Sequence, residues 1–234
     1  MRSIIIVAVL LITSGAAFAQ DVPAAAPPPG GATTPSPADT AAPAPPGNPA
    51  MTGPQLLIST AMGDITLQLD SVRAPKSVAR ILRYVKDRHY NGTVVYRVVK
   101  GFAIQMGSWD ANVKGRPGHA PSPLEANNSL SNLRGTVALA HGDDLMASAD
   151  FFINVADNTA LDHKADDAGN TTGFTVFGQV TSGMDVVDAI SNVPVGDHGP
   201  MPGQAPVDPI LIQKVSVVGE PEPTSTKAPT KKKK

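Results

Sequence analysis

The sequence predicts a mainly β fold in which antiparallel strands close into a barrel. Many short apolar runs, several of them alternating with polar residues, are separated by turn residues. Only two segments carry apolar residues at helical spacing, and strands and helices do not alternate along the chain. Because a parallel sheet needs that alternation, the pattern favours a closed antiparallel barrel.

The expected elements follow in order from these patterns. A strand that opens at Leu56 and a half-buried strand over 65–69 flank a turn and form a hairpin. A helix begins at Pro75, a residue suited to the first helical turn, and its apolar residues lie three and four positions apart. The remaining elements are a strand pair around Lys100-Gly101 within 93–107, strands at 135–140, 151–155, 174–180 and 210–218, and a second short helix over 183–190.

Composition divides the chain into four parts: a signal peptide (1–19), a Pro/Ala-rich disordered linker (20–54), a folded domain (55–218) and a disordered Lys-rich tail (219–234). The first part has Arg2, an apolar run and Ala17-Phe18-Ala19 before Gln20, which is typical of a cleaved secretory signal. An uncleaved anchor is the alternative, but the run is shorter than the roughly 20 residues of a membrane span. We therefore expect export, into the periplasm, without a stable membrane span.

The overall composition excludes several function classes. The chain has no cysteine, which rules out a lipid-modified cysteine, disulfides and a thiol nucleophile. A formal net charge of −1 gives no field that would attract nucleic acid. The four lysines at 231–234 fit a solvated end better than a weak contact with an anionic surface. No metal is expected, because the spacing of His89, His163, His198 and the aspartates at 162, 166 and 167 matches no ligand pattern.

Two polar residues stand out within the apolar strand pair at 93–107. Arg97 lies between Tyr96 and two valines, and Gln105 interrupts a run of apolar residues. Polar side chains in apolar strands usually point into a cleft or pair with a buried group. Arg97 and Gln105 are therefore the first candidates for a functional site.

The order of several motifs resembles the cyclophilin family of peptidyl-prolyl cis-trans isomerases, of the bacterial exported kind. The motifs run from about Gly63 to Val217 and read GDITLQLD, APKSVARIL, VVYRVVKGFAIQMG, LRGTVALA, FFINVADNTALDH and FTVFGQVTSGMDVVDAI. The resemblance implies an eight-stranded antiparallel barrel with a helix over each open end. It also implies a cofactor-independent enzyme that acts on Pro-containing segments of unfolded or extended chains, as a monomer.

The resemblance assigns roles to single residues. The catalytic arginine of the family falls on Arg97 and its cleft glutamine on Gln105. Its proline-pocket residues fall on Phe102, Phe152 and Leu161, and the segment that binds the substrate backbone falls on Ala140-His141.

The chain departs from the family pattern around the expected pocket. Val95-Tyr96 replace the common Phe-His, and alanine stands at Ala103 and Ala160, where methionine and an aromatic residue are usual. Asp150, which replaces a glutamine, is also expected among the substrate-binding residues, and if it pairs with Arg97 it would either orient the guanidinium or occupy it. Phe174 takes the place of a cleft histidine or tyrosine. These changes put substrate preference in doubt and should weaken binding of cyclosporin-type ligands.

The resemblance leads to two main hypotheses. In the first, Arg97 donates a hydrogen bond to the prolyl nitrogen as the X–Pro bond twists, and the chain assists folding in the periplasm. In the second, the altered pocket leaves a non-catalytic Pro-peptide binding module or holdase. A structural spacer domain is a third reading, which the retained cleft residues disfavour.

Overall fold

A computed structural model describes residues 47–142, 146–165, 171–197 and 199–220. The expected signal peptide, the linker up to residue 46 and the tail from residue 221 lie outside the described residues. So do three members of the His/Asp set considered above: Asp166, Asp167 and His198. Among the described residues, neither α-helix has the length and hydrophobicity that a membrane-spanning helix requires.

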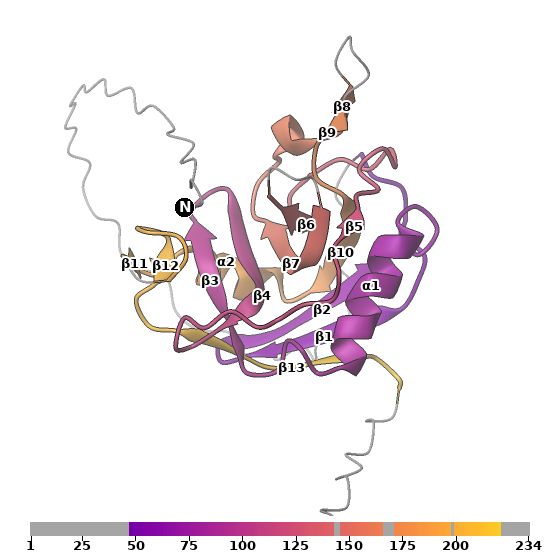
Figure 1. Cartoon of the computed structure of the whole chain (residues 1–234). Helices are drawn as coiled ribbons and strands as arrows, with labels where there is room; N and C mark the ends of the chain where they lie inside the picture. Colours follow the sequence, from indigo (N-terminus) through magenta and orange to yellow (C-terminus); the bar gives the residue numbers. More distant parts are fainter. Residues whose placement is uncertain (1–46, 143–145, 166–170, 198, 221–234) are drawn as a thin grey trace, which may run out of the picture. The chain divides into compact units, whose positions relative to one another are not determined.

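Eight antiparallel strands close the predicted barrel (Figure 1). Their order is β4-β3-β13-β1-β2-β10-β6-β7, and β7 also pairs with β4, which completes the ring. Alternate residues point inward and fill the interior, so the barrel has a packed core. The strands are β1 (Gln55–Thr60), β2 (Gly63–Leu69), β3 (Thr93–Val99), β4 (Ala103–Asp110), β6 (Thr136–His141), β7 (Met146–Asn154), β10 (Val176–Ser182) and β13 (Ile210–Val217).

Two α-helices cover the barrel, as predicted. Helix α1 (Pro75–Lys86) has proline in its first turn and packs against β7 and β13. Helix α2 (Met184–Ser191) packs against β2, β3 and β4. It begins after Gly183, whose φ of 85° and close approach to the Asp64 carbonyl oxygen leave no room for a side chain.

Several short elements were not predicted. Strand β5 (Ser122–Pro123) extends the sheet from β7, and two small ladders pair β8 (Lys164–Ala165) with β9 (Thr171–Thr172) and β11 (Val195–Gly196) with β12 (Ala205–Pro206). A 3₁₀ turn, η1 (Thr159–Leu161), follows β7. Elements of two or three residues are too short to show a hydrophobic period, which explains why the sequence pattern does not indicate them.

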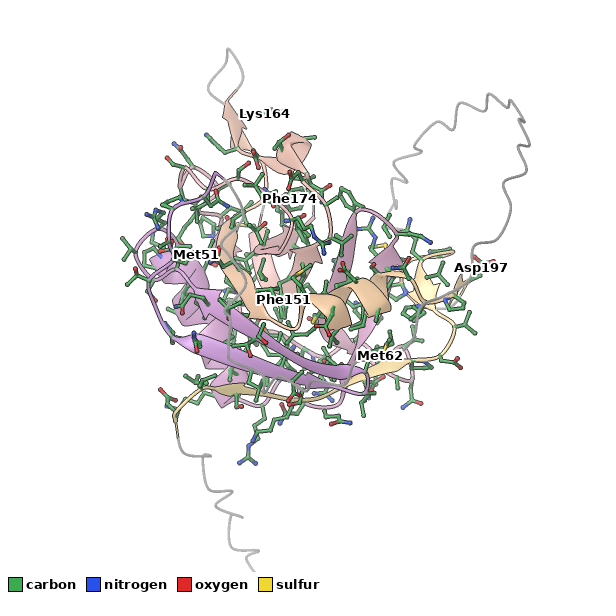
Figure 2. The ribbon with its side chains drawn as sticks, turned by 180° about the vertical axis from the view of Figure 1, so that it is seen from behind. Met51, Met62, Phe151, Lys164, Phe174 and Asp197 are labelled. Atoms are coloured by element: carbon green, nitrogen blue, oxygen red, sulfur yellow. The ribbon has the colours of Figure 1, made fainter. Side chains whose placement is uncertain are left out.

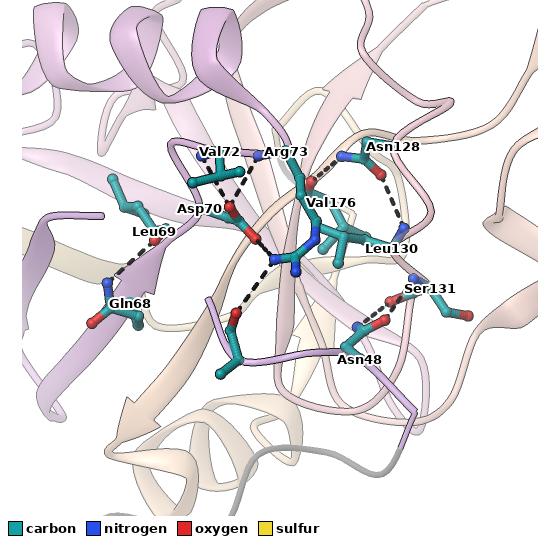
Figure 3. A network of polar contacts seen from close by, with 11 residues as sticks. Asn48, Gln68, Leu69, Asp70, Val72, Arg73, Asn128, Leu130, Ser131 and Val176 are labelled. Carbon is teal, nitrogen blue, oxygen red and sulfur yellow. Dashed lines mark hydrogen bonds and ion pairs between the residues drawn. The ribbon is translucent and has the colours of Figure 1, made fainter. Parts of the chain in front are cut away.

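Residues 47–54, which the composition places in the linker, lie on the barrel. Asn48 and Ser131 exchange two hydrogen bonds of 2.9 Å, from the amide Nδ2 to the Ser131 carbonyl and from the Ser131 N–H to Oδ1 (Figure 3). The Arg73 guanidinium, held by the buried Asp70, donates to the Ala50 carbonyl at 3.3 Å. Met51 is 8 % exposed. Contacts with the barrel therefore extend upstream of Gln55, where hydrogen bonds rather than an apolar period fix the backbone.

Candidate active site

Arg97 and Gln105 face each other across neighbouring strands on the outside of the barrel. Arg97 on β3 is the direct partner of Gln105 on β4, and Gln105 is in turn the direct partner of Phe152 on β7. Directly opposed residues point to the same face of a sheet, so the three side chains form one row. Their neighbours Ile104 and Ile153 point inward and are fully buried.

A β-bulge helps to place this row. Between Val95 and Arg97 the register of β3 against β4 shifts, because Val95 pairs with Met106 and Arg97 with Gln105. The extra residue is Tyr96, which lies buried beside the site. Bulges re-aim side chains in this way near functional sites.

Two amide oxygens hold the Arg97 guanidinium. Its Nε donates to the side-chain oxygen of Gln204 at 2.6 Å, and its Nη1 donates to that of Gln105 at 3.1 Å. Partial burial lowers the pKa of Arg97 from its ordinary value, but an arginine remains protonated at every relevant pH. Both acceptors are neutral, so they orient the cation without compensating its charge.

The Gln105 amide is fixed at both ends. Its Nε2 donates to the Tyr96 hydroxyl at 2.5 Å, while its oxygen accepts from Arg97. Burial, followed by the charge of Asp150, raises the pKa of Tyr96 well above 10, so this hydroxyl stays neutral. Tyr96, one of the departures noted in the sequence, therefore orients the glutamine that orients the arginine.

Asp150 does not pair with Arg97, which excludes both roles considered for it in the sequence. Its carboxylate accepts from the Ser108 N–H at 2.9 Å, from the Ser108 hydroxyl at 3.0 Å and from the Ser148 hydroxyl at 3.2 Å. Among the described residues, no carboxylate forms an ion pair with Arg97. The donors from Ser108 and Ser148 satisfy the Asp150 carboxylate, and the Arg97 guanidinium binds the side-chain amides of Gln105 and Gln204 instead.

An apolar cluster lies next to this polar group. We use "the apolar cluster" for a set of side chains that pack together on the outer face of β4, β6, β7 and β10 and the loops beside them. Phe152 is 5 % exposed within it, and Phe102, Leu161 and Phe174 pack on it while remaining partly exposed. The members of the apolar cluster are Met51, Phe102, Ala103, Leu130, Ala138, Ala140, Phe152, Leu161, Phe174 and Val176.

The sequence-predicted pocket residues meet in this cluster. Phe152 meets Phe174 edge-on, with ring centroids 5.4 Å apart. Figure 2 shows Phe174 near the base of the β8–β9 hairpin, whereas Phe151 lies in the barrel core. Ala103 is buried in the cluster, but Ala160 is exposed on η1 and lies outside it. Only one of the two alanine replacements therefore alters the packed surface.

Ala140 belongs to the apolar cluster, and His141 contacts it through the ring of Phe174. The register of β6 against β7 shifts between Leu139 and His141, which leaves Ala140 at the irregularity. The His141 ring stacks on Phe174, with centroids 4.3 Å apart and an interplanar angle of 25°. Its Nε2 lies 3.1 Å from the Gly173 carbonyl oxygen, so the ring is used to hold the loop before β10.

A network of asparagine side chains, which was not predicted from the sequence, supports the loops that carry part of the apolar cluster. The Asn158 side chain donates to the Phe102 carbonyl at 2.9 Å and to Asn154 Oδ1 at 2.7 Å. Asn132 donates from its backbone and its side chain to the carboxylate of Asp162, which directly follows Leu161. Asn132 and Asn154 are fully buried. The loops that carry Phe102 and Leu161 are thus tied to one network.

No group of three or more potential metal-ligating side chains comes together within the described residues. Asp162 binds Asn132 and Ser131, and His89 lies beside Tyr84 and Tyr90, so these members of the His/Asp set have separate surroundings.

Gln204 is a further site residue that was not predicted from the sequence. It lies in a Gly- and Pro-rich loop, 107 positions after Arg97, where no period or motif marks it. Its position depends on the tertiary fold, which brings β12 against β3.

Comparisons with known proteins agree with this geometry. Residues 55–217 match the model of the family described as "Cyclophilin type peptidyl-prolyl cis-trans isomerase/CLD". The chain is 41 % identical over 170 residues to peptidyl-prolyl cis-trans isomerase A of Dickeya dadantii, covering 72 % of this chain and 87 % of that protein. It is 38 % identical over 156 residues to peptidyl-prolyl cis-trans isomerase B of Escherichia coli, covering 66 % and 94 %.

A solved structure shows the same fold. The Cryptosporidium parvum cyclophilin type peptidyl-prolyl cis-trans isomerase superposes with a TM-score of 0.57 at 21 % identity, and the match covers 72 % of this chain and 99 % of that one. The barrel, the family match and the relatives lead to one conclusion: this chain belongs to the cyclophilin family of peptidyl-prolyl cis-trans isomerases.

Proposed function

We propose that the chain accelerates rotation about X–Pro bonds and that Arg97 stabilises the twisted transition state. The observation that carries this proposal is a charged, braced guanidinium next to an apolar cluster. Gln105 links the two, because it hydrogen-bonds Arg97 and lies opposite Phe152. A proline residue combines an apolar ring with the nitrogen of the rotating bond. An apolar surface beside a cation can therefore bind the ring and the nitrogen at the same time.

Amide resonance sets the barrier of about 18–20 kcal/mol to X–Pro rotation. In the twisted state the prolyl nitrogen becomes pyramidal and gains a lone pair, which the planar states do not offer. A donor placed at that nitrogen binds the transition state more tightly than either ground state, and this difference accelerates the reaction. Within the described residues, no acceptor binds the Nη2 group of Arg97, so its N–H bonds are the donors that we assign to the substrate.

The apolar cluster supplies the surface that holds the proline ring. We assign the ring to the surface formed by the partly exposed Phe102 and Leu161 over the buried Phe152, which would hold it while the preceding carbonyl turns. Phe174 and Ala103 border this surface. The backbone at Ala140-His141, where the β6–β7 ladder is irregular, is the segment that we assign to the peptide backbone of the substrate.

The contacts divide the polar site residues into two roles. Gln105 and Asp150 were both expected to bind substrate. Because the Gln105 amide is engaged by Arg97 and Tyr96, we assign it to positioning the arginine. Because its carboxylate is engaged by Ser108 and Ser148, we assign Asp150 to holding Ser108 rather than to binding substrate.

We further propose that the chain is exported to the periplasm and acts there on Pro-containing segments of unfolded or extended proteins, as a monomer. The proposed export is supported by the signal-like segment at 1–19 and by the absence of cysteine in the sequence. Reactions of this kind need no metal or other cofactor, because the step breaks no covalent bond.

The test is an NMR exchange assay on an Ala-Pro peptide, with wild type beside Arg97→Ala. Loss of one transition-state donor is expected to lower the catalysed rate by about 10²–10³-fold. Circular dichroism checks that the variant is folded, and peptide binding is measured separately.

The competing function is a binding module without turnover, which the altered residue Ala103 favours. A wild type that binds Pro peptides but exchanges them no faster than the spontaneous reaction would refute the enzyme and leave that module. A folded Arg97→Ala with the wild-type rate would refute the role of the guanidinium.

A further inference from the structure

We propose that Gln204 is a positioning residue for the isomerisation, and that its amide oxygen holds the Arg97 guanidinium in its working orientation. The inference rests on the function proposed for Arg97 and adds a residue that no part of the family motif indicates. Gln204 comes from the loop before β12, on the opposite side of Arg97 from the strand that carries Gln105.

The contact between Gln204 and Arg97 is short and charge-assisted. The Nε–H of Arg97 donates to Gln204 Oε1 at 2.6 Å, against 3.1 Å for the bond from Nη1 to Gln105. Hydrogen bonds from a cation are about twice as strong as those between neutral groups. Both bonds come from the same cation, and the one to Gln204 is the shorter of the two.

Two braces are needed because one does not define the orientation of a guanidinium. An arginine side chain has four flexible torsions, and a single hydrogen bond leaves the plane free to rotate about it. Acceptors on Nε and on Nη1 together fix the plane. Each N–H bond of Nη2 then has a fixed direction, which is what a donor to a pyramidal nitrogen requires.

The loop itself is held without the Gln204 side chain. The Gln204 carbonyl accepts from the Val98 N–H at 2.7 Å, next to Arg97 on β3, and the Gln204 N–H donates to the Met201 carbonyl at 3.1 Å. Ala205, the next residue, is buried in β12. A change of the Gln204 side chain therefore removes the brace while the backbone contacts keep the loop in place.

The experiment compares full-length wild type with Gln204→Leu, which preserves bulk but removes the acceptor, and with Gln204→Ala as a second variant. The exposed Gln213 on β13 provides the matched control, Gln213→Leu. Exchange kinetics on an Ala-Pro peptide give kcat and KM. We expect both Gln204 variants to lose roughly tenfold in kcat with KM within about twofold of wild type, because the substrate is still bound but the donor is misplaced.

A spectroscopic readout separates positioning from a loss of structure. The Nε–H proton of Arg97 should give a slowly exchanging resonance in the wild type and in Gln213→Leu, and this resonance should be lost in the Gln204 variants. A folded Gln204→Leu with wild-type kcat, or with the Arg97 resonance unchanged, would overturn the inference.

Arg97→Ala, measured in the same series, distinguishes the two possible failures. If Arg97→Ala is slow and the Gln204 variants are not, only the role of Gln204 is refuted. If Arg97→Ala retains the wild-type rate, the function proposed for Arg97 fails and the brace has no catalytic purpose.

Discussion

Asn154 is predicted to be among the most costly polar residues to remove, although it is not one of the residues assigned to the substrate. Its side chain is fully buried and makes three hydrogen bonds: to Thr136 Oγ1 at 2.9 Å, to Asn132 Oδ1 at 3.3 Å, and from Asn158 Nδ2 at 2.7 Å. Each such bond contributes about 0.5–1.5 kcal/mol net, and a buried partner left unsatisfied adds to the cost. For Asn154→Ala we expect a loss of about 3 kcal/mol in the free energy of unfolding.

Urea unfolding and thermal unfolding measure this loss. For a domain of this size, about 3 kcal/mol corresponds to a fall of roughly 6–12 °C in Tm. Asn192→Ala is the matched control, because Asn192 is exposed and its bond to the Asp188 carbonyl at 2.8 Å competes with water. The control should lie within about 0.5 kcal/mol of wild type.

The same variant should also weaken substrate binding. Asn154 holds Asn158, which in turn donates to the Phe102 carbonyl, so the proline surface loses a support. The double variant Asn154→Ala/Asn158→Ala should cost less than the sum of the two single variants, since the residues share one network. A loss below about 0.5 kcal/mol for Asn154→Ala, or strict additivity, would refute the idea that the network acts as a unit.

Two further predictions concern the backbone and pH. Gly183→Ala places a Cβ 2.2 Å from the Asp64 carbonyl oxygen at a φ of 85°, so it should cost about 3 kcal/mol or more in urea unfolding. Gly101→Ala, at a φ of 70° with nothing within 4 Å, should cost only about 1–2 kcal/mol, and equal losses would contradict the steric argument. Burial, with the nearby charge of Arg116, lowers the pKa of His89 below 6.5 in the folded state. The unfolded chain then takes up this proton first, so the free energy of unfolding should fall as pH drops through about 6.5. His89→Gln should reduce this slope between about pH 7.5 and 5.5, and an unchanged slope would show that His89 does not cause it.

Much of the fold could be predicted because the long strands and both helices carry clear periods. Gln105 stood out within an apolar run, and the structure places it in line with Arg97 and Phe152 while its neighbour Ile104 is buried in the core. The short ladders β8–β9 and β11–β12 could not be predicted in this way. Their pairing depends on where the barrel places two loops, and that information is spread over the whole fold.

The candidate site was predicted as far as residue type could signal it. Arg97 and Gln105 were noticeable because polar groups in apolar strands are costly unless partnered. Their partners could not be inferred, since Gln204 lies in a loop without a pattern and Tyr96 becomes an orienting residue only through a β-bulge. Asp150 illustrates the same limit, because its place in the family pattern suggested Arg97 as a partner while the fold supplies two serines.

The most direct test of the account is the rate of Arg97→Lys at saturating peptide. The account requires a positioned donor and not merely a positive charge near the prolyl nitrogen. Lysine keeps the charge, but its single ammonium group cannot be braced by the amides of Gln105 and Gln204 while it donates to substrate. Arg97→Lys should therefore lose about 10²-fold or more in kcat and lie close to Arg97→Ala, with similar peptide affinity. A folded Arg97→Lys with a rate close to wild type would contradict the account, because charge alone would then suffice.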